Sequence, residues 1–351
     1  MSIFIIMLIL FLLYNIKFSF RNGFEDYMSP QKSNSIKGFF VLMVLLSHAR
    51  KFIKVDSSPI NAPFQDFMSF FGQMMVVMFL FYSGYGIMLG LKNKEGYAKS
   101  ILLKRFPMVL IHFDIAVIIY YALSFFLEKD YSVKRFVLSL LGLSNVGNEV
   151  WFIFMTLILY LLTFSIFIIF QNKTVLGTVL MTVFTFLLVF IMIRWKGNDH
   201  WWYDTIMCYP LGMWYALAKP YIDKKLINDF NKWFSCTVSV GILFFFMTYI
   251  MDNYGRRMRY FIPAALLLGL FITLITMRVS FNNKILAWFG NHVFSIYILH
   301  YIPMRILAKL GLTDSAFLFT AISLAVTIVL AHFYEKAMNK LDVMLKLSKK
   351  R

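Results

Sequence analysis

Residues 35–52 read "SIKGFFVLMVLLSHARKF" and combine a strongly apolar run with two ionisable side chains. Ten residues separate Lys37 from His48, and nine of these are apolar or glycine. On a helix the two positions lie about 16 Å apart along the axis, roughly half of a ~30 Å hydrocarbon core. An ionisable side chain at that depth is costly and usually marks a site or a pathway. The segment therefore predicts a membrane span with a functional histidine, unless His48 is a neutral imidazole bonded to a carbonyl of a neighbouring helix.

The composition of the whole chain is that of a membrane protein. Its 351 residues are 60% hydrophobic and only 15% charged, whereas soluble domains are nearer one half apolar. The formal charge of +18 has no soluble basic face to carry it, so membrane topology explains the cations better than nucleic acid does. Cys208 and Cys236 have no companion Cys or His cluster, which indicates packing residues and predicts no metal site.

Eleven apolar segments have the length of about 20 residues that a membrane helix needs. They cover residues 2–20, 36–53, 66–91, 103–127, 150–170, 175–194, 202–219, 233–251, 260–278, 287–308 and 314–334. The first has no basic region before its apolar core and no cleavage site of small residues, so residues 1–22 are predicted to be a retained transmembrane anchor. The sequence thus predicts an all-α fold, a polytopic transmembrane helical bundle.

The distribution of cations predicts the orientation in a cell membrane. With the N-terminus outside and the C-terminus in the cytoplasm, 22 of the 35 lysines and arginines fall on the inside, as the positive-inside rule requires. Residues 336–351 form a basic tail, read either as an amphipathic helix on the cytoplasmic leaflet or as a plain positive-inside signal. One cluster violates the rule, because Arg256, Arg257 and Arg259 fall on the outer side.

Several motifs in register resemble the acyltransferase 3 family of integral membrane acyltransferases. The first core helix of that family carries a basic residue and, after ten intervening residues, a histidine, which Lys37 and His48 match. The other matching segments are "FLFYSGYGIMLG" (79–90), "LLKRFP" (102–107), "WFIFMTLILYLL" (151–162), "GNHVFSIYILHYIP" (290–303) and "HFYEKAMNK" (332–340). The resemblance covers about residues 33–340, the predicted membrane acyltransferase domain, and implies a ten-helix core plus one extra N-terminal transmembrane helix.

The sequence departs from the family pattern at two motifs. The closing element has Ala337 where proline is usual, and the common Arg-x-x-Arg pair is reduced to Arg105, with Leu102 at the upstream position. We also expect no relay through a large extracytoplasmic domain. The resemblance therefore implies the residues that bind the acyl donor less firmly than it implies the histidine.

The resemblance and the polar residues together assign candidate roles. His48 is the expected general base, and His300, at the histidine of the family signature, is expected to face the same cavity; the alternative for His300 is a packed, hydrogen-bonded histidine. Glu149 either orients His48 or is a solvated interfacial carboxylate. The phosphates of an acyl donor are expected to bind Lys37, Lys104 and Arg105. The positive-inside rule alone explains the cations of the loop 92–105 equally well. The acceptor residues are expected to be Arg256, Arg257 and Arg259, with anchoring to lipid headgroups as the alternative.

These roles predict a membrane acyltransferase. It is expected to move an acyl group, preferentially acetyl, from acyl coenzyme A to a hydroxyl of a cell-surface glycan or of its lipid-linked precursor. Acyl coenzyme A is a substrate here, and no bound cofactor is expected. His48 acts either as the general base or as the group that carries the acyl unit across. The alternative functions are a polysaccharide or lipid transporter, disfavoured by the absence of an inverted repeat, and a purely structural membrane partner.

Overall fold

The computed structural model describes residues 2–53, 62–170, 173–255 and 257–348. The chain is 78% helical, as the apolar segments predict. Helices dominate because a membrane leaves backbone polar groups no water to bond, and a helix satisfies them within one segment. The α and 3₁₀ or π helices and the strands, in chain order, are α1 (Ser2–Leu13), β1 (Ile16–Phe18), α2 (Pro30–Ala49), α3 (Ala62–Phe71), η1 (Gly72–Val76), α4 (Val77–Asn93), α5 (Tyr97–Ser100), η2 (Ile101–Arg105), α6 (Phe106–Phe126), α7 (Val133–Leu140), α8 (Trp151–Ile169), α9 (Thr174–Lys196), η3 (His200–Trp202), α10 (Cys208–Leu226), α11 (Phe230–Tyr254), α12 (Met258–Thr276), β2 (Val279–Phe281), α13 (Lys284–Asn291), α14 (Val293–Leu299), α15 (Tyr301–Lys309) and α16 (Ala316–Met344).

Seven helical segments of the described chain are long and apolar enough to cross a membrane. An eighth candidate is a broken helix, in which 284–291 and 293–309 meet at an angle of 66°. The predicted number of eleven spans is not confirmed. The predicted spans at 2–20, 36–53 and 202–219 became α1, α2 and α10, which are too short or too polar to be among these segments.

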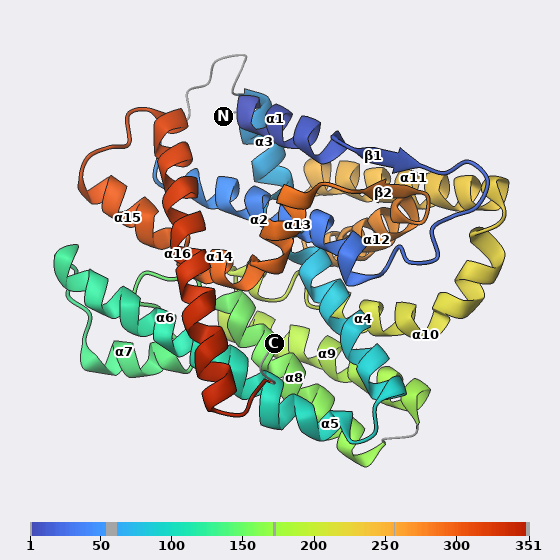
Figure 1. The fold of residues 1–351 in the computed structure, drawn as a ribbon, viewed down its shortest axis with the longest axis horizontal. Coiled ribbons are helices and arrows are strands. Elements are labelled where there is room, and N and C mark those ends of the chain that lie inside the picture. Colours follow the sequence, from blue (N-terminus) through green and yellow to red (C-terminus); the bar gives the residue numbers. More distant parts are fainter. Residues whose placement is uncertain (1, 54–61, 171–172, 256, 349–351) are drawn as a thin grey trace.

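The N-terminal segment departs from the prediction of one continuous span. Helix α1 ends at Leu13 after 12 residues, fewer than the roughly 20 that a span needs. The chain then forms β1, which pairs antiparallel with β2 so that Lys17 lies opposite Ser280. The two strands run side by side, and β2 lies next to α12 (Figure 1). The anchor role of residues 1–22 stays a prediction.

Arg278 fastens this corner of the fold. Its side chain is fully buried, and its guanidinium donates to the carbonyls of Ser19, Phe20, Arg21 and Ile227 at 2.8–3.1 Å. These carbonyls belong to residues outside the helices and strands, and a buried carbonyl without a hydrogen bond is costly. The arginine therefore holds the turn after β1 against the end of α12.

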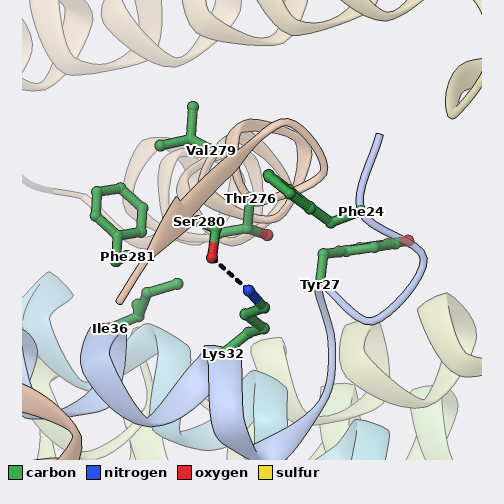
Figure 2. A pocket seen from close by; sticks show the side chains of 8 residues that line it. All are labelled: Phe24, Tyr27, Lys32, Ile36, Thr276, Val279, Ser280 and Phe281. Atoms are coloured by element: carbon green, nitrogen blue, oxygen red, sulfur yellow. Dashed lines mark hydrogen bonds between the residues drawn. The ribbon is translucent and has the colours of Figure 1, made fainter. Parts of the chain in front are cut away.

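A small cavity lies beside this corner. Figure 2 shows Lys32 reaching from α2 toward β2, where Nζ donates to Ser280 Oγ over 2.7 Å. The cavity measures about 10 Å³, which is room for no more than one water molecule. It is therefore a packing feature and has no space for a substrate.

The basic tail continues the last helix. Helix α16 is a single helix of 29 residues that reaches Met344, so no break separates the tail from the span. Met338 and Asp342 are buried, and Asp342 Oδ1 lies 2.9 Å from His112 Nε2 of α6. Whether residues 336–351 contact a lipid leaflet stays a prediction.

Candidate active site

Two glycines allow α2 to lie unusually close to α13. A Cβ at Gly38 would overlap the carbonyl of Leu286, and a Cβ at Gly290 would overlap the carbonyl of Asn34. Both residues are helical, so the absence of a side chain, and not an unusual φ, is what the contact requires. The close approach fixes the position of α2 against the broken helix α13–α15, near the centre of the molecule (Figure 1).

His48 of α2 and His300 meet across this interface. His300 lies between α14 and α15, and its Nε2 is 2.6 Å from His48 Nδ1. The ring centroids are 4.8 Å apart and the ring planes differ by 16°. The sequence predicted that both histidines face one cavity, and the structure brings them into direct hydrogen-bond contact.

The hydrogen bonds define which nitrogen of each neutral ring carries the proton. His300 Nδ1 lies 3.1 Å from the carbonyl of Ile296, which can only accept, so this nitrogen is the donor. His300 Nε2 must then accept, which makes His48 Nδ1 a donor. Of the four ring nitrogens, only His48 Nε2 then keeps a lone pair that no hydrogen bond uses. This nitrogen is the basic atom of the site.

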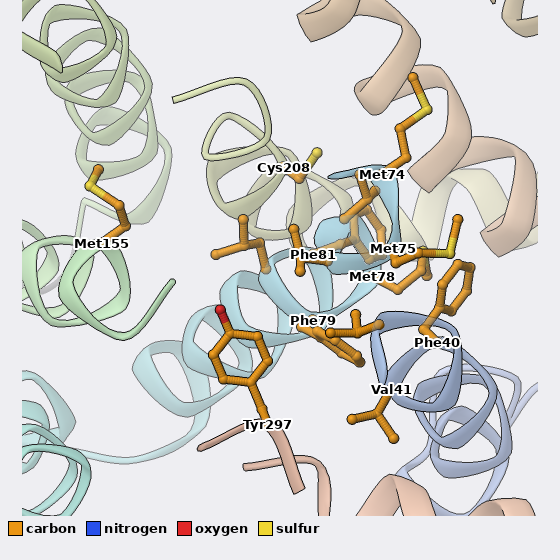
Figure 3. Packing of buried hydrophobic residues seen from close by; sticks show 14 of the residues in the cluster. Phe40, Val41, Met74, Met75, Met78, Phe79, Phe81, Met155, Cys208 and Tyr297 are labelled. Carbon is orange, nitrogen blue, oxygen red and sulfur yellow. The ribbon is translucent and has the colours of Figure 1, made fainter. Parts of the chain in front are cut away.

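The two rings differ in their access to ligands. His300 is 1% exposed, whereas His48 is half-buried. Of the two rings, His48 is therefore the more exposed, and His300 is the one enclosed by the protein. Tyr297, one turn before His300, packs its ring 6.0 Å from that of His300 and extends into the apolar core around Phe79 and Phe81 (Figure 3).

A ring of three hydrogen bonds borders the histidine pair. Glu149 Oε1 accepts from Lys51 Nζ at 2.7 Å and from the hydroxyl of Tyr301 at 2.8 Å, and Lys51 Nζ also donates to Tyr301 Oη at 2.8 Å. The ring of Tyr301 lies 5.0 Å from that of His48 and 4.6 Å from that of His300. Glu149 thus bonds Lys51 and Tyr301 and not His48, and its charge is balanced by Lys51.

Sequence reasoning did not select Lys51 or Tyr301. The available signal was position alone, because Lys51 follows His48 by three residues and Tyr301 directly follows His300. Residues three apart on a helix are neighbours on its surface. Neither spacing indicates that Lys51 and Tyr301 both bond the carboxylate of Glu149, which lies in a third segment of the chain.

The predicted donor residues lie at two separate places. Lys37 is partly buried in α2, eleven residues before His48, so that the two share a helix face with the buried Val41 and Val44 between them. Lys104 and Arg105 lie in η2 (Ile101–Arg105), and among the described residues α2 and η2 are not a closely packed pair of elements. The structure therefore places Lys37 apart from the other two cations.

Lys104 and Arg105 lie in the π-helical turn η2 that precedes α6. Both side chains are exposed, and the guanidinium of Arg105 lies 5.5 Å from the ring centroid of Tyr97. A cavity of about 60 Å³ lies next to Tyr97, bounded by Lys94 and Glu95. This volume is far below the 300–1,000 Å³ of a typical small-molecule pocket, so the cavity has no room for a nucleotide.

Two of the predicted acceptor arginines, Arg257 and Arg259, lie at the start of α12. Arg257 and Arg259 are exposed, and Arg259 lies 4.8 Å from the ring centroid of Tyr260. Arg256 lies outside the described residues. In the part of the chain that the structure describes, neither Arg257 nor Arg259 forms a salt bridge, which leaves two cations for an anionic ligand.

The described residues contain no group of three or more His, Cys, Asp or Glu side chains that could hold a metal ion. The side chains that the structure brings together at the site are the His48–His300 pair, Lys51, Tyr301 and Glu149.

Comparison with known proteins covers most of the chain. A family model for an acyltransferase domain, Acyl_transf_3, matches residues 32–334. This range includes both histidines, Glu149 and Arg105. No curated protein and no solved structure matches the chain.

Proposed function

The chain belongs to the acyltransferase 3 family and is a membrane acyltransferase, and from this premise we propose that it transfers an acetyl group from acetyl coenzyme A to a hydroxyl of a cell-surface or lipid-linked glycan. The observation that carries the proposal is the His48–His300 hydrogen bond of 2.6 Å. It leaves the lone pair of His48 Nε2 as the basic atom on the accessible side of the pair. A transferase that acts on a hydroxyl needs such a base near neutral pH.

In the proposed reaction His48 acts as a general base. Its Nε2 removes the proton of the acceptor hydroxyl while the hydroxyl oxygen attacks the carbonyl carbon of the acetyl thioester. The tetrahedral intermediate collapses, the carbon–sulfur bond breaks, and the coenzyme A thiolate takes the proton from the His48 imidazolium. His300 accepts the hydrogen bond from His48 Nδ1 throughout, which holds the ring in one tautomer and shares its charge.

The donor is proposed to approach from the cytoplasmic face. Arg105 and Lys104 are exposed cations on a short segment, and Arg105 can bind a phosphate through two parallel hydrogen bonds. Lys37 lies on the same face of α2 as His48 and is proposed as a third cation that contacts the donor. The small size of the cavity near Tyr97 supports phosphate binding at the surface rather than burial of the nucleotide.

The acceptor is proposed to approach from the opposite, outer face. The exposed Arg257 and Arg259 suit a phosphate or carboxylate, such as the diphosphate of a lipid-linked glycan or an acidic sugar. The N-terminus is proposed to lie outside and the C-terminus in the cytoplasm of a cell membrane, which places the basic residues of 92–105 on the inner side.

The proposal is tested with purified protein in lipid nanodiscs and acetyl coenzyme A that is labelled in the acetyl group. We expect label to appear in an added glycan or glycolipid fraction, together with release of free coenzyme A in equal amount. Release and labelling that are no faster than with empty nanodiscs would contradict the acetyl coenzyme A donor. Movement of unmodified glycan across sealed vesicles, without coenzyme A release, would instead indicate a transporter.

A further inference from the structure

We propose that Lys51 is a second catalytic residue of this site, whose ammonium group stabilises the negative charge that forms on the acyl carbonyl oxygen during transfer. The inference rests on the function proposed above. A general base alone does not stabilise the negative charge that develops on the carbonyl oxygen. The inference adds a hydrogen-bond donor for that charge.

The position of Lys51 fits this role. Tyr301 packs against the rings of both His48 and His300, and Lys51 Nζ lies 5.5 Å from the centroid of the Tyr301 ring and 2.8 Å from its hydroxyl. Lys51 and His48 therefore flank the same tyrosine. This arrangement would bring a group bound in front of His48 within reach of the ammonium.

The ammonium also has a donor to spare. An ammonium group offers three N–H bonds, and the described contacts use two of them, to Glu149 and to Tyr301. The side chain of Lys51 is 55% exposed, so its third N–H faces solvent or a ligand. An acyl oxygen can take this position without breaking the existing ring of hydrogen bonds.

The ion pair with Glu149 explains how a cation can be tolerated beside a base. The carboxylate of Glu149 balances the charge of Lys51, which reduces the electrostatic cost of placing an ammonium near the histidine pair. Stability alone gives a weak reason for the pair, because an ion pair with one half-exposed partner contributes little to folding. Glu149 is thus a positioning residue that holds Lys51 toward the histidines.

The chemistry requires only groups that are already named. As the acceptor oxygen bonds the carbonyl carbon, the π-electron pair moves onto the carbonyl oxygen, and the hydroxyl proton moves to His48 Nε2. Lys51 donates a hydrogen bond to this oxyanion and keeps its own protons. With hydrogen bonds of about 2.7–3.1 Å at both ends, this geometry requires the base nitrogen and the ammonium to lie on opposite sides of the tetrahedral carbon.

The test compares Lys51→Met, Lys51→Arg and Glu149→Gln with the wild type in the labelled acetyl transfer assay. Removal of one oxyanion donor lowers kcat by about 10²–10³-fold in other enzymes, and we expect Lys51→Met to lower kcat about 100-fold or more. The KM values for donor and acceptor should stay within about threefold, since the oxyanion exists only in the transition state. Lys51→Arg should retain more activity than Lys51→Met, and Glu149→Gln should lose less than Lys51→Met.

Lys309→Met is the matched control. Lys309 forms a comparable ion pair with Glu128 at 2.6 Å, away from the histidine pair, and its loss should leave kcat unchanged. A thioether analogue of acetyl coenzyme A, which has no carbonyl at the sulfur, should bind wild type and Lys51→Met equally. Thermal melting shows whether each variant is folded, and Lys51→Arg, which keeps the charge, carries the test if Lys51→Met is not.

Three results would overturn the assignment. Unchanged kcat in Lys51→Met would exclude a catalytic role, and a rise in the acceptor KM alone would make Lys51 a binding residue. A larger loss in Glu149→Gln than in Lys51→Met, with no further loss in the double variant, would show that Glu149 is the acting group and that Lys51 only holds it. Absence of turnover in the wild type would instead refute the proposed acetyl transfer itself, and this inference with it.

Discussion

Substitution of Gly38 by alanine tests how the fold creates the histidine pair. The new Cβ would overlap the carbonyl of Leu286, a backbone atom that cannot rotate away, so α2 and α13 must separate by about 1 Å. The bond between His48 and His300 is 2.6 Å long and joins α2 to a residue beyond the break that follows α13, so a displacement of α2 at Gly38 should also shift His48 relative to His300. A misplacement of about 1 Å in a catalytic group can reduce turnover about 10²-fold, which is the loss that we expect.

The assay measures initial rates of labelled acetyl transfer and the thermal midpoint of each variant in the same nanodiscs. Overpacking of this kind also costs about 1–3 kcal/mol of stability, so the midpoint of Gly38→Ala should fall. Gly86→Ala is the matched control, because a Cβ at Gly86 meets nothing within 4 Å and alanine favours a helix. Wild-type turnover by folded Gly38→Ala would show that close packing of α2 against α13 does not position the base.

Three further substitutions test separate parts of the account. His300→Ala should lower kcat about 10²-fold with a smaller effect on KM, because His48 loses the partner that fixes its tautomer; rates like those of the wild type would make His300 a packing residue. Arg105→Ala should raise the KM for acetyl coenzyme A about tenfold or more and leave the acceptor KM unchanged, whereas an altered topology with unchanged donor affinity would indicate a positive-inside signal only. Replacement of Arg257 and Arg259 by glutamine should raise the acceptor KM and flatten its salt dependence, and acceptor kinetics that are the same at all ionic strengths would exclude an anionic acceptor at this site.

The sequence predicted the helical class and most of the long apolar helices. A run of about 20 apolar residues predicts a membrane helix without information from the rest of the chain. It did not predict where α1 ends, since the pairing of β1 with β2 joins segments more than 250 residues apart. The break at the start of α14 also escaped prediction. Residues 287–308 read as one span, yet the two helical parts meet at 66°.

The candidate site shows the same division between local signal and long-range contact. His48 attracted attention because a histidine inside an apolar run is unusual, and the resemblance to a known family added His300. The contact between them joins positions 252 residues apart, and a local sequence pattern cannot predict a contact between such distant positions. Lys51 and Tyr301 look ordinary in the sequence, and only the fold brings them together on Glu149.

Turnover by His48→Ala is the most direct test of the central claim, that His48 Nε2 is the base for acyl transfer. The variant should insert and fold normally, because removing a polar side chain from an apolar segment does not raise its cost of insertion. We predict loss of acetyl transfer by at least about 10²-fold, with binding of acetyl coenzyme A retained, since general base catalysis contributes about 10²–10⁴-fold. Near wild-type transfer by folded His48→Ala would contradict the account.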